Sequence, residues 1–182
     1  MSDKEKNAKS QKSDKSEDIA PISEELKKYK QLEAIIRHKK LVIDACEILG
    51  KRLIERGNGD EFNGRKLIAN SYLHDHSKFS GVEWKSLIPD DDNEKLKESL
   101  HQHVDTNEHH PECWGGINNM PKIYIAEMVC DWFARSTEFG TDLRAWIKDK
   151  AVPKYDMSPQ GRAYKTIKDF VDLLLEQQFK KI

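Results

Sequence analysis

The feature that most constrains the fold is a run of apolar residues at helical spacing near the N-terminus. The run comprises Leu26, Tyr29, Leu32, Ile35, Ile36, Leu41, Val42, Ala45, Leu49 and Leu53. Steps of three and four positions place most of these side chains on one face of a helix. Ser23 can cap its first turn, and Gly57 can end it. We therefore predict one long helix whose apolar face must be buried against other helices.

The rest of the chain shows the same helical spacing in shorter segments. Helices are predicted over about 61–72, 93–104 and 121–138, from Gly140 to about 148, and from the capping pair Ser158-Pro159 to about 179, with a helical turn over 82–88. Pro121 suits a first helical position, while 105–119 and the stretch through Pro153 are expected to be loops. No segment alternates apolar and polar residues as a half-buried strand does. The predicted fold class is all-α.

The charged N-terminus sets the domain boundary. Residues 1–20 alternate Lys, Ser, Asp and Glu with almost nothing to bury, which is typical of a disordered tail. This stretch lacks the apolar core of a secretory signal, and no segment approaches the roughly 20 apolar residues of a membrane helix. Residues 21–182 are long enough for one compact domain with its own core. We therefore predict a single helical domain behind a charged tail.

Charge and cysteine content limit the classes of binding partner and the cellular compartment that we expect for this chain. The chain has 31 Lys and Arg against 32 Asp and Glu, so its formal net charge of −1 indicates neither a nucleic-acid partner nor a membrane surface. Cys46, Cys113 and Cys130 are odd in number and irregularly spaced, which argues against a disulfide framework and a zinc ribbon. We expect a reduced, cytoplasmic protein, and the sequence leaves its oligomeric state open.

Two polar residues stand out on apolar helical faces. His38 follows Ile35 by three positions and precedes Val42 by four, so it lies on the buried stripe of the first helix. A histidine there either makes a hydrogen bond in the core or binds a metal. Asp131 lies in an apolar helix, where an unpaired carboxylate would cost several kcal/mol. Its partner is therefore an arginine or a divalent cation, and Glu127, one turn earlier, could support the site from outside.

An adjacent His74 and Asp75 close the second predicted helix. Consecutive side chains at a helix end can converge, so both could reach one metal, whereas His76 should point away. Near the end of a later helix, His103 is a better candidate than His101. Residues two apart on a helix face nearly opposite directions, so only one of these two can face the site.

The loop after that helix contains His109 and His110, followed by Pro111. Two consecutive histidines in a loop can supply one or two nitrogen ligands, and the sequence does not decide which of the two binds. The alternative is a polar loop that carries histidines by chance. Imidazole and carboxylate groups together suit Mn, Fe, Zn or Co better than Ca, with Mg also a candidate. We expect one or two ions held by His38, His74, Asp75, His103, His109, His110 and Asp131.

The order His, His-Asp, Asp resembles the HD-domain superfamily of metal-dependent phosphohydrolases. In that superfamily a helical bundle holds the metal through the residues that correspond here to His38, His74, Asp75 and Asp131. Members with two metals add histidines before the last aspartate, where this chain has His103 with His109 or His110. Over 35–138 the strings His-Asp-x-Ser-Lys-Phe, Asn-x-His-His-Pro-Glu and Glu-Met-x-x-Asp-Trp are similar to a small HD-like family that is frequent in phages and bacteria.

The resemblance implies an HD-type helical bundle that hydrolyses a nucleotide or another small phosphate ester, and it does not specify the substrate. The chain has no Gly-Tyr-Pro after the histidine pair, so the resemblance does not imply cyclic-di-GMP hydrolysis. Other classes remain open. Histidine-rich HD-type proteins include di-iron oxygenases, an HD scaffold could keep its metal for stability while binding a ligand or protein, and a helical adaptor would need no metal.

In the hydrolase hypothesis, a metal-bound water ionises near neutral pH and attacks phosphorus. Asp75 would hold the ion, and Lys78, three residues later, would pair with the phosphate. Glu83 would position the water. Each of these residues has a plain surface or packing role as the alternative. Further candidates for contacting the substrate are Arg65 for the phosphate and Trp84 and Trp114 for stacking on a base.

Overall fold

The computed structural model describes residues 23–86 and 93–176, and within these ranges every regular element is helical. The elements are α1 (Glu24–Arg56), α2 (Glu61–Ser71), η1 (His76–Phe79), α3 (Gly81–Lys85), α4 (Asn93–Thr106), η2 (Pro111–Trp114), α5 (Lys122–Phe139), α6 (Leu143–Trp146), η3 (Ile147–Ala151), α7 (Val152–Lys154) and α8 (Arg162–Leu175). The all-α prediction is confirmed. The predicted tail, 1–20, lies outside the described residues.

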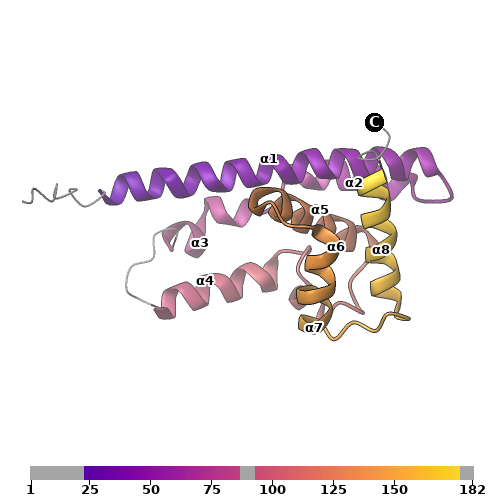
Figure 1. Cartoon of the computed structure of the whole chain (residues 1–182). Coiled ribbons are helices and arrows are strands. Elements are labelled where there is room, and N and C mark those ends of the chain that lie inside the picture. Colours follow the sequence, from indigo (N-terminus) through magenta and orange to yellow (C-terminus); the bar gives the residue numbers. More distant parts are fainter. Residues whose placement is uncertain (1–22, 87–92, 177–182) are drawn as a thin grey trace, which may run out of the picture.

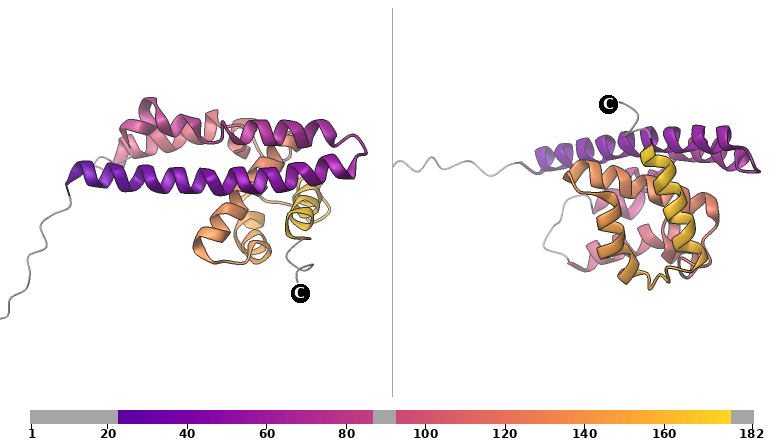
Figure 2. Two further views of the ribbon diagram at one scale, coloured as in Figure 1. Left: turned by 90° about the horizontal axis from the view of Figure 1, so that it is seen from above. Right: turned by 45° about the vertical axis from the view of Figure 1, so that its right-hand side comes forward.

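Helix α1 runs along the whole length of the molecule (Figure 1). Its first turn is capped as predicted, because the Ser23 hydroxyl accepts a hydrogen bond from the Leu26 amide. It ends at Gly57, whose φ of +67° suits a residue without a Cβ atom. The predicted apolar stripe is fully buried at Val42, Leu49 and Leu53. Viewed from above, α1 separates α2 and α3 on one side from α6–α8 on the other (Figure 2).

Two glycines bring α1 and α2 into close contact. A Cβ atom on Gly50 would lie 2.8 Å from the Gly64 carbonyl oxygen, and a Cβ on Gly64 would lie 2.5 Å from the Gly50 carbonyl oxygen. Both distances are shorter than van der Waals contact, so only glycine permits this backbone approach. His74 follows soon after the end of α2 at Ser71. The close contact between the two helices therefore positions His74 beside α1.

The core is built around α5, which packs against α1, α2 and α8. Ile125, Ala126, Val129 and Cys130 on this helix have no exposed surface. Cys46 and Cys130 are free thiols buried in this core, while Cys113 is partly exposed. None of the helices in the described ranges is long and apolar enough to cross a membrane.

Three sequence-based boundaries are wrong. Pro121 is the N-cap of α5 rather than its first helical residue. The expected loop through Pro153 is helical, because α6, η3 and α7 follow one another without a break from Leu143 to Lys154. Ser158 does not cap the last helix. Its hydroxyl accepts from the Gln160 amide and its carbonyl from the Gly161 amide, so a turn precedes α8, which begins at Arg162.

Candidate metal centre

Side chains from five parts of the chain meet beside the middle of α1. His38 comes from α1, His74 and Asp75 from the turn after α2, His103 from α4, His109 and His110 from the loop before η2, and Asp131 from α5. All seven predicted ligands are thus brought together. His76 and His101 are exposed, as expected for residues turned away from the site. The seven residues form two sets that share Asp75.

The first set combines His38, His74, Asp75 and Asp131. The Nε2 atom of His38 lies 2.9 Å from Asp131 Oδ1, and the Nε2 atom of His74 lies 3.6 Å from Asp75 Oδ2. One donor atom each from His38, His74 and Asp75 lies within 4.8 Å of the other two. That spacing suits donors around one ion.

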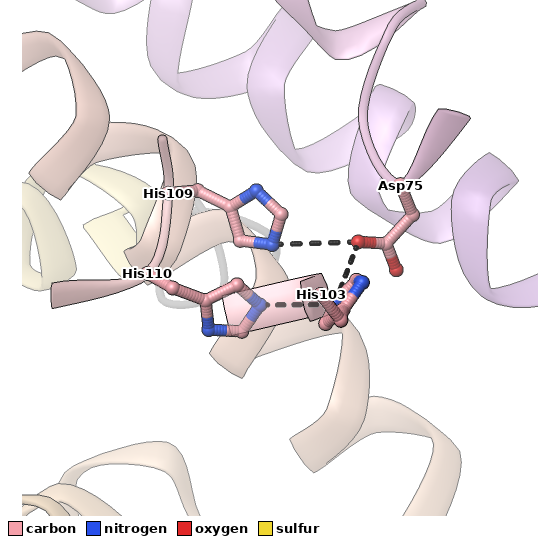
Figure 3. A group of neighbouring side chains, drawn as sticks. All are labelled: Asp75, His103, His109 and His110. Atoms are coloured by element: carbon pink, nitrogen blue, oxygen red, sulfur yellow. Dashed lines mark hydrogen bonds and ion pairs between the residues drawn. The ribbon is translucent and has the colours of Figure 1, made fainter. Parts of the chain in front are cut away.

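The second set combines Asp75, His103, His109 and His110 (Figure 3). Asp75 Oδ1 is 3.4 Å from the Nε2 atoms of both His103 and His109. The Nε2 atoms of His103 and His110 face each other at 3.0 Å. The sequence left open which of His109 and His110 joins the site, and both lie in it. The two carboxylate oxygens of Asp75 thus face different histidines, so this residue could bridge two ions.

Three glutamates lie behind the histidines, on the side away from the centre. Glu138 contacts Nδ1 of His38 at 3.1 Å. Glu83 contacts Nδ1 of His103 at 2.8 Å. Glu127 lies 3.1 Å from Nδ1 of His74 and 3.6 Å from Nδ1 of His109, so one carboxylate serves both sets. When a carboxylate accepts the Nδ1 proton, the Nε2 lone pair is left for a metal, which is the usual arrangement around metal-binding histidines.

These outer contacts revise what the sequence indicated. Glu127 takes the supporting position expected of it. Glu83, expected to position water, contacts His103 from outside, and the sequence reading missed Glu138 altogether. The available signal was its position, seven residues after Asp131 and therefore on the same helical face. A third group of residues, His74, His109 and Glu127, also has donor atoms close enough together to hold an ion. We regard it as supporting structure because those Nδ1 atoms already have a carboxylate partner.

Unpaired buried atoms test whether the centre fits a cation. Six buried side-chain atoms of the described residues lack a hydrogen-bond partner, and four of them are His38 Nε2, His74 Nε2, His109 Nε2 and Asp75 Oδ1. The other two belong to Arg52 and Glu83. Buried polar atoms are normally paired, because leaving one unpaired costs about 1–3 kcal/mol. These four atoms all belong to the proposed ligands. Divalent cations in the two ligand sets would satisfy all four atoms, so the donors fit a metal.

The backbone of Asp75 explains how adjacent side chains serve one centre. Its φ of +52° and ψ of +27° lie in the left-handed region, which residues other than glycine seldom adopt. This conformation ends the turn after α2 and turns the carboxylate toward the histidines. Strain of this kind is typical of functional sites.

Electrostatics place most of the ligands in their metal-binding protonation states. Burial opposes ionisation of Asp75, but the charges of His74 and Lys78 outweigh it and hold the pKa of Asp75 well below its usual range. Against the same effect of burial, the nearby His38 keeps the pKa of Asp131 low. Burial and the charge of His74 lower the pKa of His109 to about 2. Ionised carboxylates and neutral imidazoles are the forms that bind metals.

The pKa values of His110 and His74 are shifted in opposite directions. Burial and the charge of His103 lower the pKa of His110 to about 4. At His74 burial acts the same way, but the hydrogen bond to Glu127 and the charge of Asp75 outweigh it and raise the pKa. A metal therefore competes with a proton at His74 and meets a neutral ring at His110.

Two cavities are lined in part by residues of the centre. A cavity of about 530 Å³ is lined by His38, Lys78 and Glu83 together with residues of α4 and the end of α5. A smaller one of about 230 Å³ is lined by His74, Asp75 and His109. Small-molecule sites typically span 300–1,000 Å³, so the larger cavity is the better candidate for a substrate.

The remaining predicted substrate contacts lie elsewhere. Arg65 and Trp84 are exposed and line neither cavity. Trp114 stacks on Tyr124 with ring centroids 5.3 Å apart, so it packs against the core helix. Lys78, by contrast, lines the larger cavity with its Nζ atom 2.5 Å from Asp75 Oδ2.

Comparisons with known proteins place the chain in one family. Neither the curated proteins nor the solved structures contain a match to it. A family model does match, over residues 27–177, and this range includes every ligand of the candidate metal centre. The chain belongs to the family of unknown function DUF5662.

Proposed function

We propose that the protein is a metal-dependent hydrolase of small phosphate esters, with nucleotides as the favoured substrates. The observation that carries this proposal is the position of Lys78. It lines the 530 Å³ cavity and contacts Asp75, the residue shared by both ligand sets. A cation beside a metal centre, in a cavity of ligand size, suits a phosphate group. The order of the ligands along the chain, which resembles HD-domain phosphohydrolases, supports the same class.

The ligand roles follow from the two sets. His38, His74, Asp75 and Asp131 would hold one ion, and Asp75, His103, His109 and His110 the other. A divalent cation there supplies a water of lowered pKa near 7 and positive charge for the phosphate oxygens. Asp75 would be a ligand of both ions. The outer glutamates would fix the orientation of the histidine rings. Lys78, whose side chain is 22% exposed, can turn from Asp75 to a phosphate oxygen.

A second candidate function rests on the nitrogen-rich second set. Three imidazoles with one carboxylate suit iron as well as manganese or zinc. A di-iron oxygenase of the HD type would use the same residues. Its signature would be iron in the purified protein and oxygen consumption with an organic substrate. A scaffold that keeps its metal for stability would show neither phosphate release nor oxygen consumption.

The test is phosphate release from a nucleotide panel in the presence of Mn, with Asp75→Ala as the inactive variant and His101→Gln as the matched control. His101 is 79% exposed, and its ion pair joins it to Asp105 rather than to the centre. We expect release by wild type and His101→Gln that chelation abolishes and Asp75→Ala lacks. If wild type binds metal but releases no more phosphate than Asp75→Ala, the hydrolase proposal fails. Oxygen uptake would then favour the di-iron candidate.

A further inference from the structure

The larger cavity extends beyond the metal centre and carries cations that the proposed hydrolysis does not use. Besides Lys78, its lining includes Arg37 from α1 and Arg135 from α5. Arg37 directly precedes His38, and Arg135 lies one helical turn after Asp131. Both arginines thus neighbour a ligand of the first set along the chain, and both line the cavity that His38 also lines. The cavity therefore has three cationic side chains, of which Lys78 contacts the ligand Asp75.

The acidic residues of the cavity do not cancel these cations. Its carboxylates include Glu83 and Glu138, and both are bound to histidine Nδ1 atoms, of His103 and His38 respectively. Arg135 reaches Glu138 at 3.0 Å, yet its side chain remains 46% exposed. Arg37 is also exposed. Both guanidinium groups can thus turn to a ligand, and guanidinium matches phosphate by forming two parallel hydrogen bonds.

Apolar side chains complete the cavity. Ile35, Leu96 and Phe139 line it alongside the arginines. Leu96 and Phe139 are 45% and 74% exposed, which leaves apolar surface for an organic group to cover. The lining thus offers the candidate ligand His38 and Lys78 for one anionic group, an arginine pair for another, and apolar surface for the part that joins them.

We propose that the substrate carries a second phosphate group besides the one that is hydrolysed, and that Arg37 and Arg135 bind it. This inference rests on the proposed phosphohydrolase function and specifies its substrate class as nucleoside diphosphates or bisphosphates. Lys78 and the metal ions engage the phosphoryl group that reacts. Arg37 and Arg135 hold the other phosphate and thereby select against monophosphates.

Binding measurements separate this inference from turnover. The full-length Mn-loaded protein is titrated by calorimetry with two analogues that resist hydrolysis, adenosine 5′-(α,β-methylene)diphosphate and the phosphonate analogue of adenosine 5′-monophosphate. We expect the diphosphate analogue to bind at least about tenfold more tightly, since its second phosphate adds charge-assisted hydrogen bonds to the guanidinium groups. Arg37→Gln and Arg135→Gln should each remove most of that preference while leaving the affinity for the monophosphate analogue within about twofold.

Lys40→Gln is the matched control, because Lys40 is 74% exposed on the same helix and pairs with Asp44. It should leave both affinities unchanged. Equal binding of the two analogues, an unaltered preference in the arginine variants, or no binding at all would overturn the inference. Phosphate release from esters is measured separately, so a protein that hydrolyses monophosphates without this preference keeps its proposed function and loses only the second-phosphate site. An arginine-dependent preference for the diphosphate analogue without any hydrolysis would support the second-phosphate site and contradict the proposed hydrolase function.

Discussion

The Nε2 atom of His38 lies 2.9 Å from Oδ1 of Asp131, and the two side chains are only 3% and 16% exposed. His38 belongs to α1 and Asp131 to α5, so the contact joins the two longest helices of the described chain. Two ligands of one ion would lie this close together, because each would direct its donor atom at the same point.

Replacing Asp131 with Asn keeps its size but removes the charge that an ion needs. Loss of a direct ligand should weaken Mn binding by more than about 100-fold, the upper figure for changes in outer residues. The ion-induced rise in melting temperature should disappear with it, because a ligand stabilises only what it binds. Metal content after gel filtration and thermal unfolding with and without Mn measure both effects. Wild-type Mn affinity in Asp131→Asn would contradict the assignment.

Glu127 supports one histidine of each ligand set, so its removal should affect both ions. Glu127→Gln is expected to lower the affinity for both ions by about 10–100-fold. Glu83→Gln touches only His103 and should weaken one of them, and Glu138→Gln, behind His38, should weaken the other. Mn stoichiometry by elemental analysis across a titration distinguishes these patterns. A Glu127→Gln protein that loses no more metal than Glu83→Gln would show that the carboxylate is not shared.

The candidate ligands could be found from the sequence because their residue types are unusual where they occur. A histidine on an apolar stripe and an aspartate in an apolar helix require partners, as His38 and Asp131 do. Glu138 and Arg135 could not be found that way, because charged residues on helices are ordinarily solvated. Only the folded arrangement turns Glu138 toward His38. The left-handed backbone conformation of Asp75 could not be predicted from the sequence either, because the spacing argument treats every residue up to the helix end as helical.

The contact between Gly50 and Gly64 should make α2 sensitive to a single methyl group. In Gly64→Ala the new Cβ would meet the Gly50 carbonyl at 2.5 Å and force the helices apart. Overpacking of this kind costs about 1–3 kcal/mol. Arg65→Ala is the control, because the side chain is exposed and alanine favours a helix. Urea unfolding of both variants tests the expectation. Equal stability of Gly64→Ala and wild type would show that the helices can separate without cost.

Asp60 should give the fold a pH dependence unrelated to metal. Its side chain lies 2.6 Å from Arg56 and 2.6 Å from Lys122. Burial alone would raise the pKa of Asp60, but hydrogen bonds from Lys122 and Arg56 outweigh it and lower the pKa below its usual value. A lowered folded-state pKa contributes stability above the unfolded value of about 3.9, and this contribution is lost as the pH falls through the folded value.

Asp60→Asn should therefore destabilise the metal-free protein at pH 7 by about 1–2 kcal/mol, allowing for the partial exposure of both cationic partners. The difference from wild type should shrink as the pH falls below about 4, because the wild-type carboxyl is then being neutralised. Urea unfolding with chelator present, at pH 7 and near pH 3, measures the difference. A difference that stays constant with pH would exclude the ion pairs as its source.

The central claim is that Asp75 is shared by two metal ions, and diffraction from crystals grown with Mn tests it most directly. Anomalous difference maps should show two peaks on either side of the Asp75 carboxylate. One peak should lie among His38, His74 and Asp131, and the other among His103, His109 and His110. A single peak, or none at saturating Mn, would contradict the claim.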